Sequence, residues 1–291
     1  MHLIIEAIVY GKRSFGFTGI IYVDLVGISL VITIIYFLYQ NKNKFIYFLL
    51  SIIFLSALLF TQTRNAWLSS GVIMIGILIQ YTIKSFKEKK SFSFLFLKVA
   101  LFLTPIIFVI VQLNQSDLAI FERVNISAFS NTELTGETLK TTGSLITRLF
   151  IWDTALNAFL ENPFTGIGLY TFPFLSFKYS TLDPLMYKMF VELLPPHQTF
   201  LAILCETGII GFFGFIFLIY TTTNQSWQIT KKVKSEEEKI YSTIILWLMI
   251  YIFVSMLMTD AWLWGNLFML WTLLLGMSSA NIKYILNKSS I

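Results

Sequence analysis

The stretch FLAILCETGIIGFFGFIFLIYTT at residues 200–222 decides the fold class of this sequence. It holds one charged residue, Glu206, in 23 positions, and a helix of about 20 apolar residues crosses the hydrocarbon core of a bilayer. Six other apolar runs are of comparable length, at residues 20–39, 45–60, 66–83, 94–112, 240–258 and 262–277. The sequence therefore predicts an all-α, polytopic integral membrane protein with about seven transmembrane helices.

The composition agrees with a membrane-embedded chain. Of the 291 residues, 56% are hydrophobic and 13% are charged, whereas a soluble domain has about 25% charged residues. The net charge of +5 comes from lysines in short loops, and no basic segment with interleaved aromatic residues predicts a nucleic acid partner. The single cysteine, Cys205, excludes an intramolecular disulfide and an all-cysteine metal site.

Lysine and arginine residues are distributed unevenly between the two sides of the predicted spans. One side carries 12 of them in about 45 loop residues and the other carries 8 in about 110, and basic residues are enriched in cytoplasmic loops. We therefore expect three parts: an N-terminal tail with four spans at residues 1–112, an extracytoplasmic loop region at 113–197, and three spans with a cytoplasmic tail at 198–291.

The basic tail before the first span conflicts with this orientation. Lys12 and Arg13 would lie outside, although a short basic tail is normally retained in the cytoplasm. Either the tail is translocated or the chain is the C-terminal part of a longer protein, and we prefer the second interpretation.

The predicted outer loop divides into a polar part and an amphipathic part. Residues 113–144 are polar and are expected to be mobile. From Leu145 to Phe159 apolar residues recur every three or four positions, which predicts an amphipathic helix. Asn162-Pro163 ends this helix, because proline cannot continue it.

After that helix, Gly166 and Gly168 predict a turn. The aromatic residues of segment 170–179 are expected to lie at the membrane interface, where aromatic rings are favoured.

His197 follows Pro195-Pro196 at the junction of the loop and a span, so it is expected in or just before the first helical turn. On a continuous helix, Gly208 and Gly211 lie within about 40° of the His197 direction, and such a small-residue stripe permits close helix packing. Two interpretations stay open: His197 takes part in extracytoplasmic chemistry, or it is an interfacial residue above a packing seam.

Glu206 is nine residues beyond His197, about 13.5 Å deeper along an ideal helix and on its opposite face. An acid inside a span is costly unless it is protonated or paired. We therefore expect Glu206 to have a structural pairing role, with an outer arginine as one candidate partner.

Arginines near the predicted outer face suggest anion binding. Arg64 precedes a span at its outer end, where a cation opposes the helix dipole; Arg148 lies on the amphipathic helix, and Arg13 precedes the first span. Guanidinium groups bind phosphate and pyrophosphate in a bidentate manner, although each side chain could instead reach for the interface. No motif for a metal or for a nucleotide triphosphate is present.

Several segments resemble a known family. RLFIW at residues 148–152, NPFTGIG at 162–168, HQ at 197–198 and GIIG at 208–211 are similar to the C-terminal core of the O-antigen ligase and O-antigen polymerase superfamily. TRNAW at 63–67 and KRSFG at 12–16 resemble its arginine motifs. The resemblance covers nearly the whole chain, and the spacing from HQ to GIIG is its most specific part.

The resemblance implies transfer or polymerisation of glycans from an undecaprenyl-pyrophosphate carrier onto a lipid or glycan acceptor, with neither nucleotide sugar nor metal. By the same resemblance, His197 corresponds to the essential histidine, and Arg64 and Arg148 correspond to pyrophosphate-binding arginines, whereas Arg13 matches less closely. Trp152 and the two glycines of GIIG, with Glu206, are expected to support the site.

The resemblance also implies a bacterial inner-membrane protein that works with other membrane proteins of polysaccharide assembly, such as those that build lipopolysaccharide. It does not separate ligases, polymerases and protein glycosyltransferases. Two alternatives stay open: a transporter or channel in which Asp24 and Glu206 mark an ion path, and an inactive, truncated member of the family.

Overall fold

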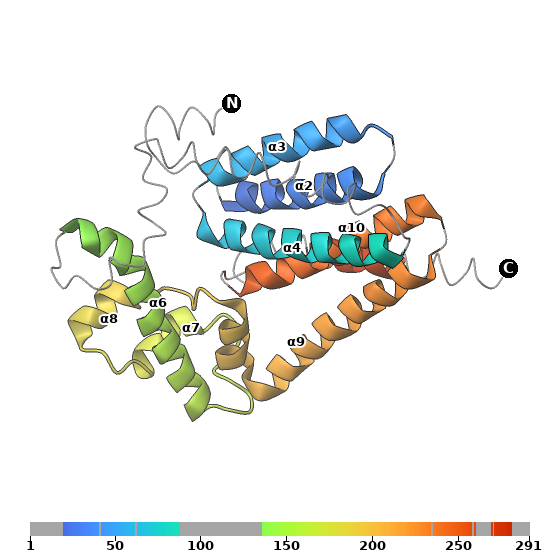
Figure 1. The fold of residues 1–291 in the computed structure, drawn as a ribbon. Helices are drawn as coiled ribbons and strands as arrows, with labels where there is room; N and C mark the ends of the chain where they lie inside the picture. The colour runs from blue at the N-terminus through green and yellow to red at the C-terminus, as the bar shows by residue number, and fades with distance from the viewer. Residues whose placement is uncertain are drawn as a thin grey trace. The chain divides into compact units, whose positions relative to one another are not determined.

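A computed structural model describes residues 20–40, 42–61, 63–87, 136–233, 235–257, 259, 269 and 271–280, with the side chains of 20–22, 64, 65 and 136–146 left undescribed. Every regular element in these ranges is a helix (Figure 1), which confirms the predicted all-α class. The predicted span at 94–112 and Arg13 lie outside the described residues.

The chain forms two compact units. Of the described residues, unit 1 contains α2 (Ile20–Tyr39), α3 (Lys44–Phe60), α4 (Arg64–Lys87), the end of α9 (Thr199–Lys232) from Thr223 onward, α10 (Glu236–Met256) as far as Ile252, and residues 272–280. Unit 2 contains α6 (Gly136–Glu161), α7 (Phe172–Leu175), the 3₁₀ helix η2 (Ser176–Lys178), α8 (Pro184–Phe190), α9 as far as Thr222, and the described residues from 253 to 271.

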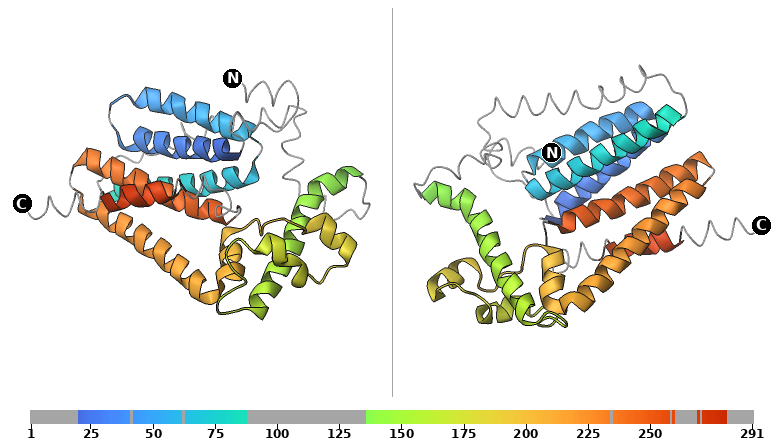
Figure 2. Two further views of the ribbon diagram at one scale, coloured as in Figure 1. Left: turned by 180° about the vertical axis from the view of Figure 1, so that it is seen from behind. Right: turned by 60° about the horizontal axis from the view of Figure 1, so that its bottom comes forward.

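In unit 1, helices α2, α3 and α4 lie side by side, as both ribbon figures show (Figure 2). Helix α2 is apolar almost all round, and its central residues Leu30, Val31, Ile34 and Ile35 are fully buried. Outward faces of the neighbouring helices are also apolar: Phe45 on α3, for example, is 71% exposed. Apolar side chains on both the inside and the outside are typical of helices in a bilayer.

Polar side chains join α10 to the other helices of unit 1. The indole nitrogen of Trp247 donates a hydrogen bond of 2.6 Å to Oε1 of Gln80 on α4. The hydroxyl of Tyr251 donates to Oδ1 of the buried Asp24 on α2 at 3.4 Å. Hydrogen bonds between helices are a common means of association inside membranes, so Asp24 has a structural use within unit 1.

Three described helices are long and apolar enough to cross a membrane: residues 66–87 of α4, α9 and α10. The start and end of α2 agree with the predicted span at 20–39, and α3 begins one residue before the predicted 45–60. Helix α9 begins one residue before the predicted 200–222 and ends ten residues after it, because its polar last turns continue past the apolar run to Lys232. The predicted total of seven spans is not tested by these residues.

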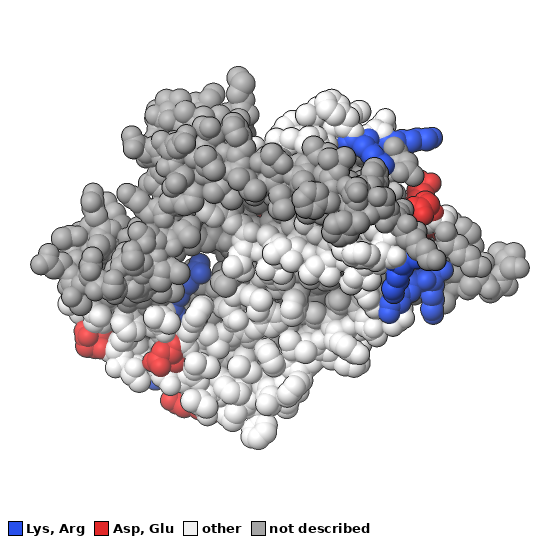
Figure 3. All heavy atoms as spheres, viewed as in Figure 1, with Lys and Arg blue, Asp and Glu red and all other residues white. Residues whose placement is uncertain are grey.

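Charged residues gather at one end of unit 1. This end contains the α2–α3 turn with Lys42, the end of α4 with Lys84, the end of α9 with Lys231, and the acidic first turn of α10. Figure 3 shows basic and acidic side chains together over this end, with an uncharged surface beside them. These lysines belong to the group predicted to lie on one side of the membrane.

Unit 2 is built around one face of α6. Its residues Ile151, Ala155 and Ala158 are fully buried against Phe172, Val191 and Cys205, which come from the following segment and from α9. Helix α6 ends at Glu161, as predicted from Asn162-Pro163, but it begins at Gly136. The helix therefore extends through residues 136–144, a polar segment in which no helix was predicted.

Candidate functional site

Helix α9 has a break at Gly208. Its backbone angles are φ 65° and ψ −170°, a conformation that glycine adopts without the strain a side chain would impose. The prediction of a small-residue stripe joining His197, Gly208 and Gly211 assumed a continuous helix and is wrong, since the helix direction changes at Gly208. A Cβ on Gly211 would lie 2.2 Å from the hydroxyl oxygen of Thr207 in the preceding turn, so Gly211 leaves space for that side chain.

The break allows the loop at residues 162–168 to form main-chain hydrogen bonds with α9. In a continuous helix the amide of Ile209 would bond to the carbonyl of Cys205. Instead Ile209 N donates to the carbonyl of Pro163 at 2.8 Å, and the Cys205 carbonyl accepts from Ile167 N at 3.0 Å. A third bond of 2.9 Å runs from Gly168 N to the carbonyl of Glu206. The loop thus satisfies backbone groups that the break leaves unpaired.

Two glycines make this close approach possible. A Cβ on Gly208 would lie 2.4 Å from the carbonyl carbon of Phe164, and a Cβ on Gly166 would lie 2.3 Å from that of Glu206. Gly166 also has a positive φ of 68°, which confirms the turn predicted there. Neither position has space for a side chain. The main chain of the NPFTGIG segment therefore packs directly against the main chain of α9.

The side chain of Glu206 holds the next part of the loop. It is 2% exposed, and its carboxylate accepts hydrogen bonds from Tyr170 N at 2.9 Å and from Phe172 N at 3.3 Å. Phe172 is fully buried and begins α7. A negative charge near a helix start is favourable, and it satisfies backbone amides that have no partner within the helix. Glu206 therefore pairs with the backbone amides of Tyr170 and Phe172, just before and at the start of α7.

His197 lies just before α9, in the left-handed region with φ 55°, an uncommon conformation for a residue with a side chain. The depth and face predicted for Glu206 relative to His197 assumed one continuous helix, whereas His197 lies before the start of α9, so helical rise does not apply to it. Gln198 caps the helix: its Oε1 accepts from Leu201 N and its carbonyl accepts from Ala202 N.

Contacts on both sides fix the backbone around His197. The indole nitrogen of Trp152 on α6 donates a 2.9 Å hydrogen bond to the carbonyl of Pro196. The hydroxyl and amide of Thr199 both donate to the carbonyl of Thr259, at 2.6 and 3.0 Å. Neither the cap at Gln198 nor the partner Thr259 was predicted, since glutamine is not a typical capping residue and Thr259 is 60 residues away from Thr199 in the sequence.

The predicted arginines lie in different parts of the structure. Arg148 is half-buried on α6, one helical turn before Trp152. Arg64 begins α4 in unit 1, and its side chain is not described. The structure therefore brings Arg148, Trp152 and His197 into one unit. Among the described residues, no group of three or more histidine, cysteine, aspartate or glutamate side chains could hold a metal ion.

These features define a membrane protein with long apolar helices and a folded segment joined to one of them. The O-antigen ligase family profile matches residues 49–216, more than half of the chain. The chain belongs to the O-antigen ligase family, and this membership implies a glycosyltransferase-like reaction in polysaccharide biosynthesis. A comparison with curated proteins found no match.

The matched range includes most of the predicted site. Arg64, Arg148, His197, Gly208 and Gly211 fall within residues 49–216, whereas Arg13 precedes them. The junction between NPFTGIG and the broken helix also lies in this range.

Proposed function

We propose that this protein transfers or polymerises glycans from an undecaprenyl-pyrophosphate carrier onto a lipid or glycan acceptor at the extracytoplasmic face of a bacterial inner membrane. Membership of the O-antigen ligase family supports the reaction type. The arginine side chains supply the positive charge that a pyrophosphate group requires. The reaction uses neither a metal nor a nucleotide sugar.

His197 is the proposed general base. The acceptor hydroxyl attacks the anomeric carbon of the donor glycan, and the bond from this carbon to the pyrophosphate oxygen breaks. The hydroxyl proton passes to the imidazole of His197, and the carrier pyrophosphate leaves as an anion. Imidazole suits this role because it is largely neutral near pH 7 and able to accept a proton.

One observation carries the proposal: Trp152 links α6 to the backbone at His197. Its indole binds the carbonyl of Pro196, the residue immediately before His197. Arg148 lies four residues before Trp152 on the same helix, about 6 Å along the helix axis. Arg148 and His197 therefore belong to one folded unit, which supports a shared site for an anionic leaving group and its attacking hydroxyl.

Arg148 and Arg64 are the proposed pyrophosphate ligands, and Arg13 is a further candidate. A guanidinium group binds two phosphate oxygens at once through its planar fork of donors. In this role the arginines balance the charge that develops on the leaving pyrophosphate, and no acid or metal is needed to assist its departure.

The proposed orientation puts the loop region at residues 113–197 outside and the lysine-rich end of unit 1 in the cytoplasm. Cysteines introduced at Lys188 and Ser235, both exposed, test it because the native Cys205 is buried. An impermeant maleimide applied to intact spheroplasts should label Lys188→Cys and leave Ser235→Cys unlabelled. Labelling of both positions to the same extent would contradict the orientation.

Reconstitution tests the proposed reaction. Proteoliposomes with the full chain, a lipid-linked oligosaccharide and a lipid or glycan acceptor should form the transferred or elongated product with EDTA present and no nucleotide added. Empty liposomes are the control. The proposal fails if product forms only with added metal or nucleotide, or if active membranes lose no glycan transfer when this protein is removed.

A further inference from the structure

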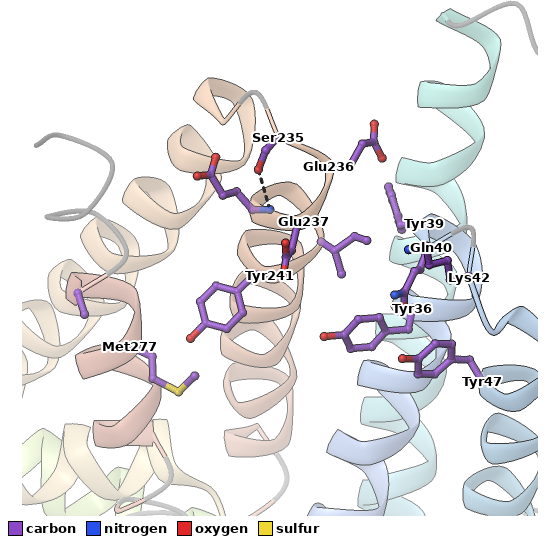
Figure 4. Close-up of a pocket in the computed structure, with 13 residues that line it drawn as sticks. Tyr36, Tyr39, Gln40, Lys42, Tyr47, Ser235, Glu236, Glu237, Tyr241 and Met277 are labelled. Carbon is purple, nitrogen blue, oxygen red and sulfur yellow. Dashed lines mark hydrogen bonds between the residues drawn. The ribbon is translucent and has the colours of Figure 1, made fainter. Parts of the chain in front are cut away.

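A cavity of about 1030 Å³ lies at the charged end of unit 1. It is bordered by the end of α2, the start of α3, the start of α10 and the helical residues 277 and 280. Figure 4 shows Tyr36 and Tyr47 directed toward this space from α2 and α3, across from Glu237 and Tyr241 of α10. The volume is at the upper end of the range for small-molecule sites, about 300 to 1,000 Å³.

Aromatic side chains form a large part of the cavity lining. Tyr36, Tyr39, Tyr47 and Tyr241 all line it. The rings of Tyr36 and Tyr47 are stacked, with centroids 4.9 Å apart and planes 12° from parallel. Tyrosine is enriched where a membrane meets water, and its ring face attracts organic cations. These tyrosine rings can therefore bind an ammonium group at the membrane interface.

Charges of both signs lie at the cavity. Lys42, in the turn between α2 and α3, lines one side, and Glu236, Glu237 and Glu238 line the other. Acidic residues in a first turn also favour the helix dipole, and Ser235 caps this helix by accepting from Glu238 N at 3.2 Å. The helix dipole does not account for the tyrosines or for Lys42. A ligand that carries both an ammonium and an anionic group matches the whole set.

The surroundings of the cavity favour a lipid over a water-soluble zwitterion. Ile240 and Met277 add apolar surface to its lining, and the bordering helices α3 and α10 are apolar beyond their first turns. Lys84 on α4 lies over the ring of Tyr39 with Nζ 4.9 Å from its centroid, as expected near head groups. The charged residues of the cavity correspond to the head group of a phospholipid, and its apolar residues correspond to the start of the acyl chains.

We propose that this cavity binds the head group of a zwitterionic aminophospholipid of the phosphatidylethanolamine type. The ammonium group contacts the rings of Tyr36, Tyr47 and Tyr241 and the carboxylates of Glu236 and Glu237. The phosphate contacts Lys42, and the start of the acyl chains lies along Ile240 and Met277. This site is separate from the proposed catalytic residues of unit 2, and it does not depend on the proposed reaction.

Native mass spectrometry of the full chain in detergent tests the site. Dioleoyl phosphatidylethanolamine and dioleoyl phosphatidylglycerol, added in equal amounts, compete as probes, and the ratio of protein bound to each lipid is measured. The wild-type protein should favour phosphatidylethanolamine, and Glu236→Gln/Glu237→Gln should reduce the ratio by roughly fivefold to tenfold. Tyr36→Leu should reduce it as well.

Two matched control variants test whether a change in the lipid ratio depends on residues of the cavity. Tyr220→Leu and Glu192→Gln change exposed residues that do not line the cavity and should leave the lipid ratio unchanged. Because the readout is a ratio within folded protein, a loss of yield does not affect it. Equal binding of the two lipids by wild-type protein, or an unchanged ratio in the double variant, would overturn the proposal. Displacement of bound lipid by millimolar free phosphoethanolamine would also overturn it, because the occupant would then be a soluble zwitterion.

Discussion

The indole nitrogen of Trp152 lies 2.9 Å from the carbonyl oxygen of Pro196 and donates a hydrogen bond to it. This bond joins the middle of α6 to the residue before His197, 44 positions away in the sequence. Pro196 is buried, so its carbonyl depends on a partner within the protein. The position of His197 is therefore set by α6 as well as by the start of α9.

Replacing Trp152 with phenylalanine tests this link. The variant keeps an aromatic ring but loses the donor, and a displacement of His197 should lower kcat for glycan transfer about tenfold with little change in KM for the donor. Kinetics are measured per folded molecule. Trp227→Phe, at a partly exposed tryptophan of α9, should retain the wild-type kcat. If Trp152→Phe lowers only the amount of folded protein, the indole has no positioning role.

Alanine at Gly208 or Gly166 should disrupt the junction between the loop and α9. Either Cβ would lie within 2.4 Å of main-chain atoms, at a positive φ, and we expect a loss of at least about 2 kcal/mol in stability. Thermal unfolding in detergent measures it. The matched control is Gly214→Ala: a Cβ there meets no heavy atom within 4 Å, and alanine favours a helix by about 1 kcal/mol. A junction variant as stable as Gly214→Ala would show that the close approach is not required.

Glu206→Gln should reduce stability more than it reduces chemistry. Glutamine offers one acceptor oxygen where the carboxylate accepts from both Tyr170 N and Phe172 N. Leaving a buried amide without a partner costs about 1 to 3 kcal/mol, so folded yield and unfolding temperature should fall while kcat of the folded fraction is retained. Glu192→Gln, at an exposed position, is the control for yield. A loss of kcat at normal stability would instead indicate a direct role in the reaction.

These results show how far the sequence could predict the structure. The ends of α2 and the end of α6 follow from local signals: an apolar run bounded by polar residues, and the Asn162-Pro163 pair. The break at Gly208 does not, because an isolated glycine is tolerated inside a helical pattern. What determines the break is the backbone of residues 163–168, which is remote in sequence and donates or accepts the displaced hydrogen bonds.

The residues of the candidate site could be predicted from the sequence, but their geometry could not. Residue types and the family resemblance indicated His197, Arg148 and Trp152, and Pro195-Pro196 indicated that His197 lies in or just before the first helical turn. No local pattern predicted its positive φ. Likewise, the depth of Glu206 suggested a charged partner, whereas two of its partners are backbone amides. Backbone groups are identical at every residue, so no sequence pattern identifies them as partners.

Lysine in place of Arg148 or Arg64 tests the proposed pyrophosphate contacts. Lysine keeps the positive charge and loses the planar pair of donors, so each variant should raise KM for the lipid-linked donor by about tenfold or more. Titration of the donor in proteoliposomes gives KM. Lys188→Arg, at an exposed position in unit 2, should have no effect. Wild-type donor use by both lysine variants would reject bidentate binding.

The most direct test of the account is glycan transfer by His197→Ala. Loss of a general base lowers the rate by about 10² to 10⁴-fold, whereas donor binding and membrane insertion do not use the imidazole. We predict that the variant inserts in the membrane, binds lipid-linked donor as the wild type does, and loses transfer to this extent in a proteoliposome assay. Transfer at the wild-type rate would contradict the account and would make His197 an interfacial packing residue.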